Sequence, residues 1–175
     1  AAANLWLFFY TPGFGVLDQI GALFGLPSVN WLGQPETALW AVIIVTIWKE
    51  AGFFMIFYLA ALQTIPTDLK EAADIEGTSR WTYTRRIVLP LLMPTTLFIM
   101  VNALINSVKL IDHLFILTKG GPSDASKLIL YYIWEMAFAF FDAPHAAALT
   151  ILILLALGIV AAIQFFYMEK RTHYQ

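Results

Sequence analysis

The chain has 175 residues, of which 60% are hydrophobic and 13% are charged, and its formal net charge is −2. A soluble domain is about 45–50% apolar and about 25% charged, so this composition, with a mean hydropathy of +0.74, indicates a protein that lies in a lipid bilayer. The net charge argues against a nucleic-acid partner, and the absence of cysteine excludes disulfides and thiolate metal sites.

The first ten residues are apolar and aromatic, but they are too few to cross a bilayer. We expect them to be the end of a membrane span whose beginning precedes Ala1, with aromatic rings at the interface. A short amphipathic stretch is predicted over residues 16–24. A loop rich in turn residues follows over residues 26–36.

Three segments are long and apolar enough to cross the membrane as helices, namely residues 37–63, 90–112 and 146–168. A polar loop of residues 64–89, which we call the knuckle, separates the first two spans. Residues 113–145 connect the second and third spans and contain an apolar part, residues 127–141, that is too short to cross. The pattern predicts an all-α, polytopic transmembrane helix bundle.

The distribution of basic residues predicts the orientation of these spans. The knuckle carries Lys70, Arg80, Arg85 and Arg86, and the C-terminal tail adds Lys170 and Arg171. The loops on the opposite side hold only Lys119 and Lys127. This asymmetry places the knuckle and the C-terminus in the cytoplasm, and in a bacterium the other side would be the periplasm.

Local signals divide the knuckle into two short helices. Asp68 is expected to cap the first helix, with Glu71 three residues later as its partner in a capping box. Gly77 suits a left-handed residue that ends this helix after about two turns. Thr78 or Ser79 is expected to start the second short helix, and Pro90 suits the first turn of the long helix that follows.

Two charged residues, Lys49 and Glu50, fall in the middle of the first span, about 18 Å of helix from either end, which is farther than a side chain can snorkel. A charge there costs at least about 2.5–3.5 kcal/mol, so we expect both side chains to face a cavity or a partner. They share a helical face with Thr46 and Phe53. Adjacent charges cannot pair face to face, so we expect their partners on other helices.

The second span repeats this pattern with a polar stripe of Asn102, Asn106, Lys109 and His113, flanked by Ser107 and Asp112. Polar faces on two consecutive spans are typical of the lining of a passage for a polar solute. The alternative is that they form interhelical hydrogen bonds that only stabilise the bundle.

No enzyme site is predicted. The three histidines, His113, His145 and His173, lack the spacing of metal ligands. Lys119-Gly120-Gly121 lacks the length and the ending of a phosphate-binding P-loop. If ATP drives this system, the hydrolysing residues are expected on another chain.

In the knuckle, Glu71-Ala72-Ala73 is followed after three residues by Gly77, after nine more by Ile87, and after one more by Leu89-Pro90. This spacing resembles the EAA loop of permease subunits of binding-protein-dependent ABC importers, and every position of that pattern is filled. The alternative interpretation is an ordinary amphipathic connector between two spans.

The segment after the second span is similar to sugar-type members of that family, of the maltose-type and glycerol-3-phosphate-type. The similar residues are Leu117-Thr118-Lys119-Gly120-Gly121-Pro122, Tyr131-Tyr132-Ile133, Ala137-Phe138 and Ala146-Ala147-Ala148. These relatives correspond to the first of two permeases in a heterodimer. One departure is Ala143-Pro144, where relatives usually have a turn that contains glycine.

The resemblance implies that this chain is the C-terminal part of one transmembrane permease domain in a bacterial or archaeal cytoplasmic membrane. Its partners would be a second permease, two ABC ATPase subunits that hold ATP and Mg, a periplasmic or lipid-anchored solute-binding protein and membrane lipid. The coupling helix that docks on the ATPase would contain Glu71, Ala72, Ala73 and Gly77.

The positions near the substrate in maltose-type relatives correspond to Thr46, Lys49, Glu50, Ala103 and Ser107 in this chain. The polar stripe of the second span adds Asn102, Asn106 and Lys109 to these candidate solute-binding residues. The expected solute is a sugar, a polyol or a glycerophospho-type compound.

Two other functions remain open at this point. The first is an ion-coupled secondary transporter or channel subunit in which Lys49, Glu50 and Asp112 carry ions or protons. Such a carrier has no need of a compact docking loop. The second is a membrane scaffold, which would leave the charges in the middle of a span unexplained.

Overall fold

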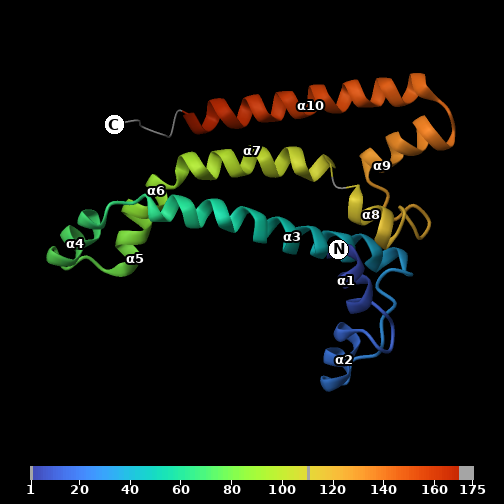
Figure 1. The fold of residues 1–175 in the computed structure, drawn as a ribbon, viewed down its shortest axis with the longest axis horizontal. Helices are drawn as coiled ribbons and strands as arrows, with labels where there is room; N and C mark the ends of the chain where they lie inside the picture. Colours follow the sequence, from blue (N-terminus) through green and yellow to red (C-terminus); the bar gives the residue numbers. More distant parts are fainter. Residues whose placement is uncertain (1, 110, 170–175) are drawn as a thin grey trace. The chain divides into compact units, whose positions relative to one another are not determined.

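The computed structural model describes residues 2–109 and 111–169, and all regular elements within this part are helices (Figure 1). The all-α prediction is therefore confirmed. The chain divides into two compact units, residues 1–50 with 106–153, and residues 51–105 with 154–175. The basic tail residues Lys170 and Arg171 lie outside the described part of the chain.

The first unit packs α1, Ala2–Phe9, and α8, Asp112–Leu117, against the N-terminal half of α3, Pro35–Gln63. In Figure 1, α1 and α2, Val16–Leu23, extend away from that half of α3. The Tyr10 hydroxyl donates to the Ala41 carbonyl oxygen at 2.9 Å and attaches the end of α1 to α3. The buried apolar cluster of this unit consists of Ala3, Trp6, Tyr10, Ala41, Val42, Val45, Leu114, Leu117 and Tyr131.

One carboxylate organises the loops on either side of α2. Asp18 accepts hydrogen bonds from the Gly13 N–H at 2.6 Å, from the Ser28 hydroxyl and from the Val29 N–H at 3.3 Å. These donors stabilise the ionised carboxylate, and the Gly13 N–H contributes most, so the pKa of Asp18 lies below its usual range. The only charge in the first 35 residues therefore serves the local fold.

The connection between α8 and α10, Ala143–Glu169, contains α9, Ile129–Trp134, and a wider turn, η2, Glu135–Ala139. The Lys127 ammonium contacts the carboxylates of Asp124 and Glu135 at 2.8 and 2.7 Å. The apolar helix that this segment forms, Ile129–Ala139, is shorter than a membrane span, as predicted.

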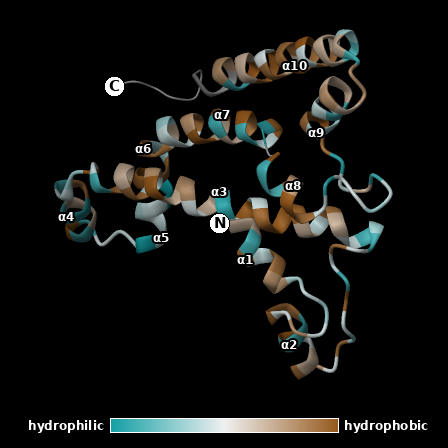
Figure 2. Cartoon of the chain, turned by 45° about the vertical axis from the view of Figure 1, so that its right-hand side comes forward, coloured by the Kyte–Doolittle hydropathy of each residue, from teal (hydrophilic) through white to brown (hydrophobic). Residues whose placement is uncertain are grey.

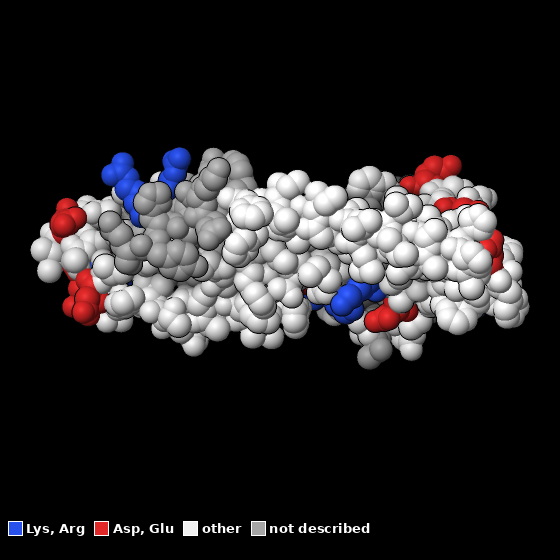
Figure 3. All heavy atoms as spheres, turned by 90° about the horizontal axis from the view of Figure 1, so that it is seen from above, with Lys and Arg blue, Asp and Glu red and all other residues white. Residues whose placement is uncertain are grey.

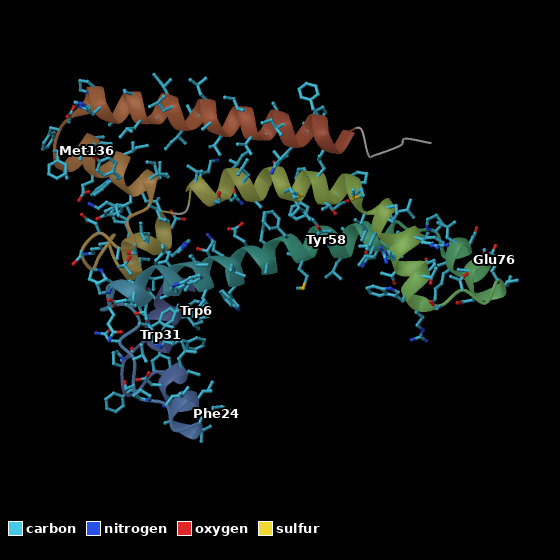
Figure 4. All side chains as sticks on the ribbon, turned by 180° about the vertical axis from the view of Figure 1, so that it is seen from behind. Trp6, Phe24, Trp31, Tyr58, Glu76 and Met136 are labelled. Carbon is cyan, nitrogen blue, oxygen red and sulfur yellow. The ribbon has the colours of Figure 1, made fainter. Side chains whose placement is uncertain are left out.

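The second unit contains the C-terminal half of α3, the knuckle helices, most of α7, Met93–Lys109, and the end of α10. Phe57 on α3 contacts Phe53 and Phe98, with ring centroids 5.2 and 5.4 Å apart. Tyr58 points from α3 toward α7 in Figure 4, and its hydroxyl donates to Thr96 Oγ1 at 3.2 Å. Aromatic packing and one hydrogen bond thus hold these two helices together.

Three apolar helices of the described chain are long enough to cross a membrane: Pro35–Gln63, Met93–Leu117 and Ala143–Phe166. Each overlaps one of the predicted spans, although the second runs from Met93 to Leu117 where residues 90–112 were predicted. The third is the most apolar, as the colouring of α10 in Figure 2 shows, and Figure 3 shows an uncharged surface over most of its length. It contains no Lys, Arg, Asp or Glu between Ala143 and Phe166.

The start of the second span differs from the prediction. Pro90 lies in a three-residue helix, α6, Leu89–Leu91, and the long helix α7 begins at Met93 with Pro94 in its first turn. Upstream of Pro90 the chain forms a π-helical turn, η1, Thr84–Val88, in which the Leu89 N–H bonds to the Thr84 carbonyl. A proline ring clashes with the carbonyl four residues earlier, and the widened turn relieves that clash.

Candidate functional site

The first helix of the knuckle, α4, Thr67–Ile75, ends as predicted at Gly77, which has a φ of +68°. The Thr78 N–H bonds to the Ala73 carbonyl at 2.9 Å, and the Gly77 N–H bonds to the Asp74 carbonyl at 3.1 Å. This pair of bonds is the Schellman motif, which satisfies carbonyls at the end of a helix. The sharp turn between the two knuckle helices is therefore fixed by backbone hydrogen bonds.

The predicted start of α4 is wrong. Pro66 occupies the N-cap position and no side chain caps the helix, while Asp68 is its second residue. The capping box between Asp68 and Glu71 therefore does not form. Proline before the first turn has no N–H to satisfy, and Asp68 still places a negative charge in the first turn, where the helix dipole favours it.

The second helix of the knuckle, α5, Arg80–Tyr83, starts at Ser79, one of the two predicted starts. The Ser79 hydroxyl oxygen accepts the Thr82 N–H at 3.2 Å, as an N-cap does. Between α4 and α5 lies an open groove of about 430 Å³. Its lining combines basic, acidic and hydroxyl side chains, namely Lys70, Asp74, Thr78, Arg80, Tyr83 and Thr84.

The knuckle exposes most of the residues that the EAA pattern singles out. Glu71, Ala72 and Gly77 are exposed, and only Ala73 is buried, with 6% of its surface accessible. Beside them, Ile75 is 88% exposed, and Figure 4 shows Glu76 at the tip of the knuckle. Ile75 is thus an exposed apolar side chain at the end of α4, next to the turn that Gly77 forms.

The first unit brings together a group of polar side chains from the predicted passage. Thr46 Oγ1 on α3 lies 2.8 Å from His113 Nε2 on α8, and it also lies 2.9 Å from the Val42 carbonyl oxygen. His113 is only 4% exposed, and its Nδ1 is buried without a hydrogen-bond partner in the described residues. A polar contact thus links the first span to the segment after the second.

Glu50 has a partner on another helix, as predicted. Its Oε2 accepts a hydrogen bond from Asn106 Nδ2 on α7 at 3.1 Å. The contact joins two residues that were both placed in the predicted passage, and it supplies a donor to a carboxylate in the middle of a span. The amide is neutral, so it stabilises the carboxylate without removing its charge.

Lys49 faces elsewhere, because adjacent residues on a helix point about 100° apart. It lines a hollow of about 210 Å³ together with Asp112 and His113, whose wall also includes Ala2, Ala3, Val45 and Ile116. Lys49 is exposed and forms no ion pair with any residue that the structure describes.

The remaining predicted residues are not gathered at this hollow. Ser107 and Lys109 are exposed near the end of α7. Asn102 and Ala103 belong to the second unit, where Asn102 Nδ2 donates to the Phe98 carbonyl of its own helix at 2.8 Å. The predicted stripe extends over α7, which ends at Lys109, and α8, which begins at Asp112, within the apolar stretch Met93–Leu117.

Sequence reasoning placed His113 on the polar stripe but missed its contact with Thr46. The available signal was a histidine beside an acidic residue at the end of an apolar span. No spacing rule connects residues 67 positions apart.

A family profile places this set of helices among known proteins. The profile described as "Binding-protein-dependent transport system inner membrane component" matches residues 3–174. The chain belongs to this family. It is therefore a component of a membrane transport system with several membrane-spanning helices, and the permease resemblance is confirmed.

Individual relatives agree with this assignment. The chain is 36% identical to a probable ABC transporter permease protein of Pyrococcus horikoshii, over 90% of this chain and 55% of that protein. It is 33% identical to the sn-glycerol-3-phosphate transport system permease protein UgpA of Yersinia pestis, over 99% of this chain and 59% of that protein. The trehalose/maltose transport system permease protein MalF of Thermococcus litoralis is 37% identical over 73% of this chain and 43% of its own length.

A solved structure shares the fold. The chain superposes with a TM-score of 0.83 and 29% identity on a chain of a bacterial ABC transporter involved in the import of the acidic polysaccharide alginate. The match covers 98% of this chain and 60% of that one. A second structure of that transporter, also with a TM-score of 0.83, is a complex with an alginate pentasaccharide-bound periplasmic protein. This chain thus spans between one half and two thirds of the length of the relatives that it matches over nine tenths or more of its own length.

Proposed function

We propose that the chain is the C-terminal part of a permease subunit in an ATP-driven importer for a sugar, polyol or glycerophospho-type solute. The observation that carries the proposal is the knuckle, a two-helix turn fixed by Gly77 that exposes Glu71, Ala72, Gly77 and Ile75. The relatives named for glycerol-3-phosphate and trehalose/maltose transport support the solute class.

In this proposal the knuckle docks on a cytoplasmic ATPase subunit that binds ATP and Mg. Glu71, Ala72 and Gly77 form the exposed part of the docking surface, with small side chains that permit close approach, whereas the fourth coupling residue, Ala73, is buried in the knuckle. A second permease subunit and a second ATPase complete the transporter, and a periplasmic or lipid-anchored binding protein delivers the solute. Closure of the ATPases moves the knuckle as a rigid lever and switches access to the passage.

The basic residues of the knuckle support the proposal that it lies on the cytoplasmic side of the membrane. We also propose a cytoplasmic C-terminus, because the same rule for basic residues applies to the tail. The proposed solute-facing residues of the first unit are Thr46, Lys49, Glu50, Asn106, Ser107 and Lys109. Asn102 and Ala103 are proposed separately for the second unit. The contact between Glu50 and Asn106 also fits the alternative in which part of this set only joins helices.

An ion-coupled carrier or channel is not favoured, because the chain belongs to a family of binding-protein-dependent transport components. A membrane scaffold has no counterpart among the relatives described above.

Copurification tests the docking role of the knuckle. Ile75→Glu places a charge on the surface that the ATPase should cover. If the ATPase buries the Ile75 side chain in the complex, the loss of this side chain alone should weaken docking by about 1.5–3 kcal/mol. We expect the ATPase to dissociate from the purified permease. Gln63→Glu, an exposed position at the end of α3, is the matched control and should retain the ATPase. Equal recovery of the ATPase with both variants would refute docking through the knuckle.

A further inference from the structure

The second helix of the knuckle, α5, runs without a break through η1 into α6 and offers two faces. One face meets α4, because residues at i, i+3 and i+4 lie on the same side of a helix and Arg80, Tyr83 and Thr84 line the groove between α4 and α5. The other face forms a separate open hollow of about 430 Å³, which we call the arginine hollow. The residues that line it are Trp81, Thr82, Arg85 and Arg86. None of the described residues in its lining belongs to α4, so it is distinct from the proposed docking surface.

The positive charge of the arginine hollow is not balanced within the part of the chain that the structure describes. Arg85 and Arg86 are exposed, and all ion pairs between described residues lie within residues 124–145. Among the described residues no carboxylate lines the hollow, although α4 carries Asp68, Glu71 and Asp74 in the same unit. The two adjacent guanidinium groups therefore lack a counter-ion among these residues, and an oxyanion with several oxygens can accept from both.

The arginine hollow lies about one turn before the apolar start of the second span. Leu89 and Leu91 are 52% and 49% exposed, so the surface that lipid tails contact begins near Leu89. Arg86 precedes Leu89 by three residues, or about 4.5 Å along a helix. The head-group region is about 5–8 Å thick on each side of the hydrocarbon core, so the guanidinium groups reach it. Trp81, which is 72% exposed, supplies the kind of aromatic ring that is enriched at this depth.

We propose that the arginine hollow binds the phosphate of an anionic phospholipid head group. Arg85 and Arg86 donate N–H groups to the phosphate oxygens, and the Trp81 ring packs beside the glycerol backbone of the lipid. A zwitterionic head group adds an ammonium, which would meet two guanidinium groups, so the hollow favours lipids with a net negative charge. This inference goes beyond the proposed importer, because it uses the position of the second span and depends neither on the solute nor on ATP hydrolysis.

Fluorescence of Trp81 in the complete importer tests the site. The complex is reconstituted in vesicles of phosphatidylcholine and phosphatidylglycerol, and bromine on the acyl chains of one lipid or the other quenches nearby indole rings. Subtracting the signal of Trp81→Phe isolates Trp81 from the other tryptophans. We expect phosphatidylglycerol to quench Trp81 at a much lower mole fraction than phosphatidylcholine does.

Charge variants test the named contacts. Arg85→Gln combined with Arg86→Gln should lower the preference for phosphatidylglycerol by about 30-fold, because each basic residue near an anionic lipid surface contributes about fivefold. Each single variant should lower it by about fivefold, which keeps the test decisive if the double variant fails to assemble. Arg80→Gln is the matched control, because it removes the same charge from the knuckle but lines the groove with α4, and it should retain the preference.

Four results would overturn the site. The first is equal quenching by the two lipids. The second is an equal loss of preference in Arg80→Gln and in the single variants of the hollow, which would indicate a diffuse effect of charge. The third is no quenching of Trp81 by either lipid, which would place a protein partner such as the ATPase over the hollow. The fourth is loss of the preference when sodium phosphate replaces sodium chloride at equal ionic strength, which would assign the hollow to free phosphate.

Discussion

Replacement of Gly77 tests whether the left-handed turn in the knuckle is needed for its shape. Gly77 has a φ of +68°, and a Cβ atom added there would meet no atom within 4 Å. The cost of Gly77→Ala is therefore conformational strain alone, about 1–2 kcal/mol. Gly77→Pro forces φ to about −65° and removes the N–H that bonds to the Asp74 carbonyl at 3.1 Å. Gly77→Pro therefore costs more than Gly77→Ala, because its backbone strain is larger and it also loses that hydrogen bond, which is worth about 0.5–1.5 kcal/mol.

Hydrogen exchange of the Thr78 amide, which bonds to the Ala73 carbonyl, reports on this turn in the purified complex. A cost of 1–2 kcal/mol corresponds to about a 5–30-fold increase in exchange for Gly77→Ala. Gly52→Ala is the matched control, because Gly52 lies within α3, where alanine is more favourable than glycine by about 1 kcal/mol. An unchanged exchange rate in Gly77→Ala would refute the strain argument. Wild-type uptake and normal ATPase stimulation by Gly77→Pro would refute the role of the knuckle in coupling.

Three further predictions concern other parts of the chain. Thiols introduced by Ser79→Cys and Ser123→Cys should be labelled from opposite faces of the membrane, the first from the cytoplasm; labelling from one face would refute the topology. Tyr58→Phe removes the hydrogen bond to Thr96 and should lower the stability of the purified complex by about 0.6 kcal/mol in a thermal unfolding assay, and no change would show that packing alone joins the helices. The pKa of Asp18 is lowered on folding, so its contribution to stability is complete above the ordinary carboxyl value of about 3.9 and is lost as the pH falls through the lowered pKa. Protection factors of the amides that donate to Asp18 should fall in that range, whereas Asp18→Asn should show no such step.

The spans were predictable because composition and length decide them. A run of apolar residues long enough to cross the bilayer must form a helix, since no water satisfies its backbone there. Gly77 was also predictable, because a glycine after two helical turns is the usual left-handed end of a helix. In both cases the cause lies within a few neighbouring residues.

The errors arose where a residue suits two neighbouring roles. Asp68 has the side chain of a helix cap, but Pro66 starts the helix earlier and leaves Asp68 in the first turn. Pro90 suits the start of a long helix, yet Pro94 is also available, and α7 starts just before the second proline. Local preferences of less than about 2 kcal/mol decide between such alternatives, and tertiary contacts override them easily.

The candidate passage shows what a sequence pattern leaves open. The need for partners for Lys49 and Glu50 followed from the cost of charges inside a membrane. Which partner each one has depends on how helices pack across the bundle. Asn106 meets Glu50, whereas Lys49 lines a hollow with His113, a residue whose burial the sequence did not predict.

Glu50 offers the sharpest separation between an ATP-driven importer and an ion-coupled carrier. Glu50→Gln removes the charge but retains a side-chain oxygen that accepts from Asn106 Nδ2, as the carboxylate does at 3.1 Å. Glu50→Gln also removes a charge that costs at least about 2.5–3.5 kcal/mol in the middle of a membrane-spanning helix. If Glu50 serves to join α3 and α7, ATP-dependent uptake in proteoliposomes should survive this change and should not respond to collapse of the proton gradient. Asn106→Leu is the matched variant, because it removes the donor, keeps the half-buried charge and should destabilise the complex by about 1.5–3 kcal/mol. Loss of uptake in Glu50→Gln together with normal assembly would show that the ionised carboxylate itself takes part in transport.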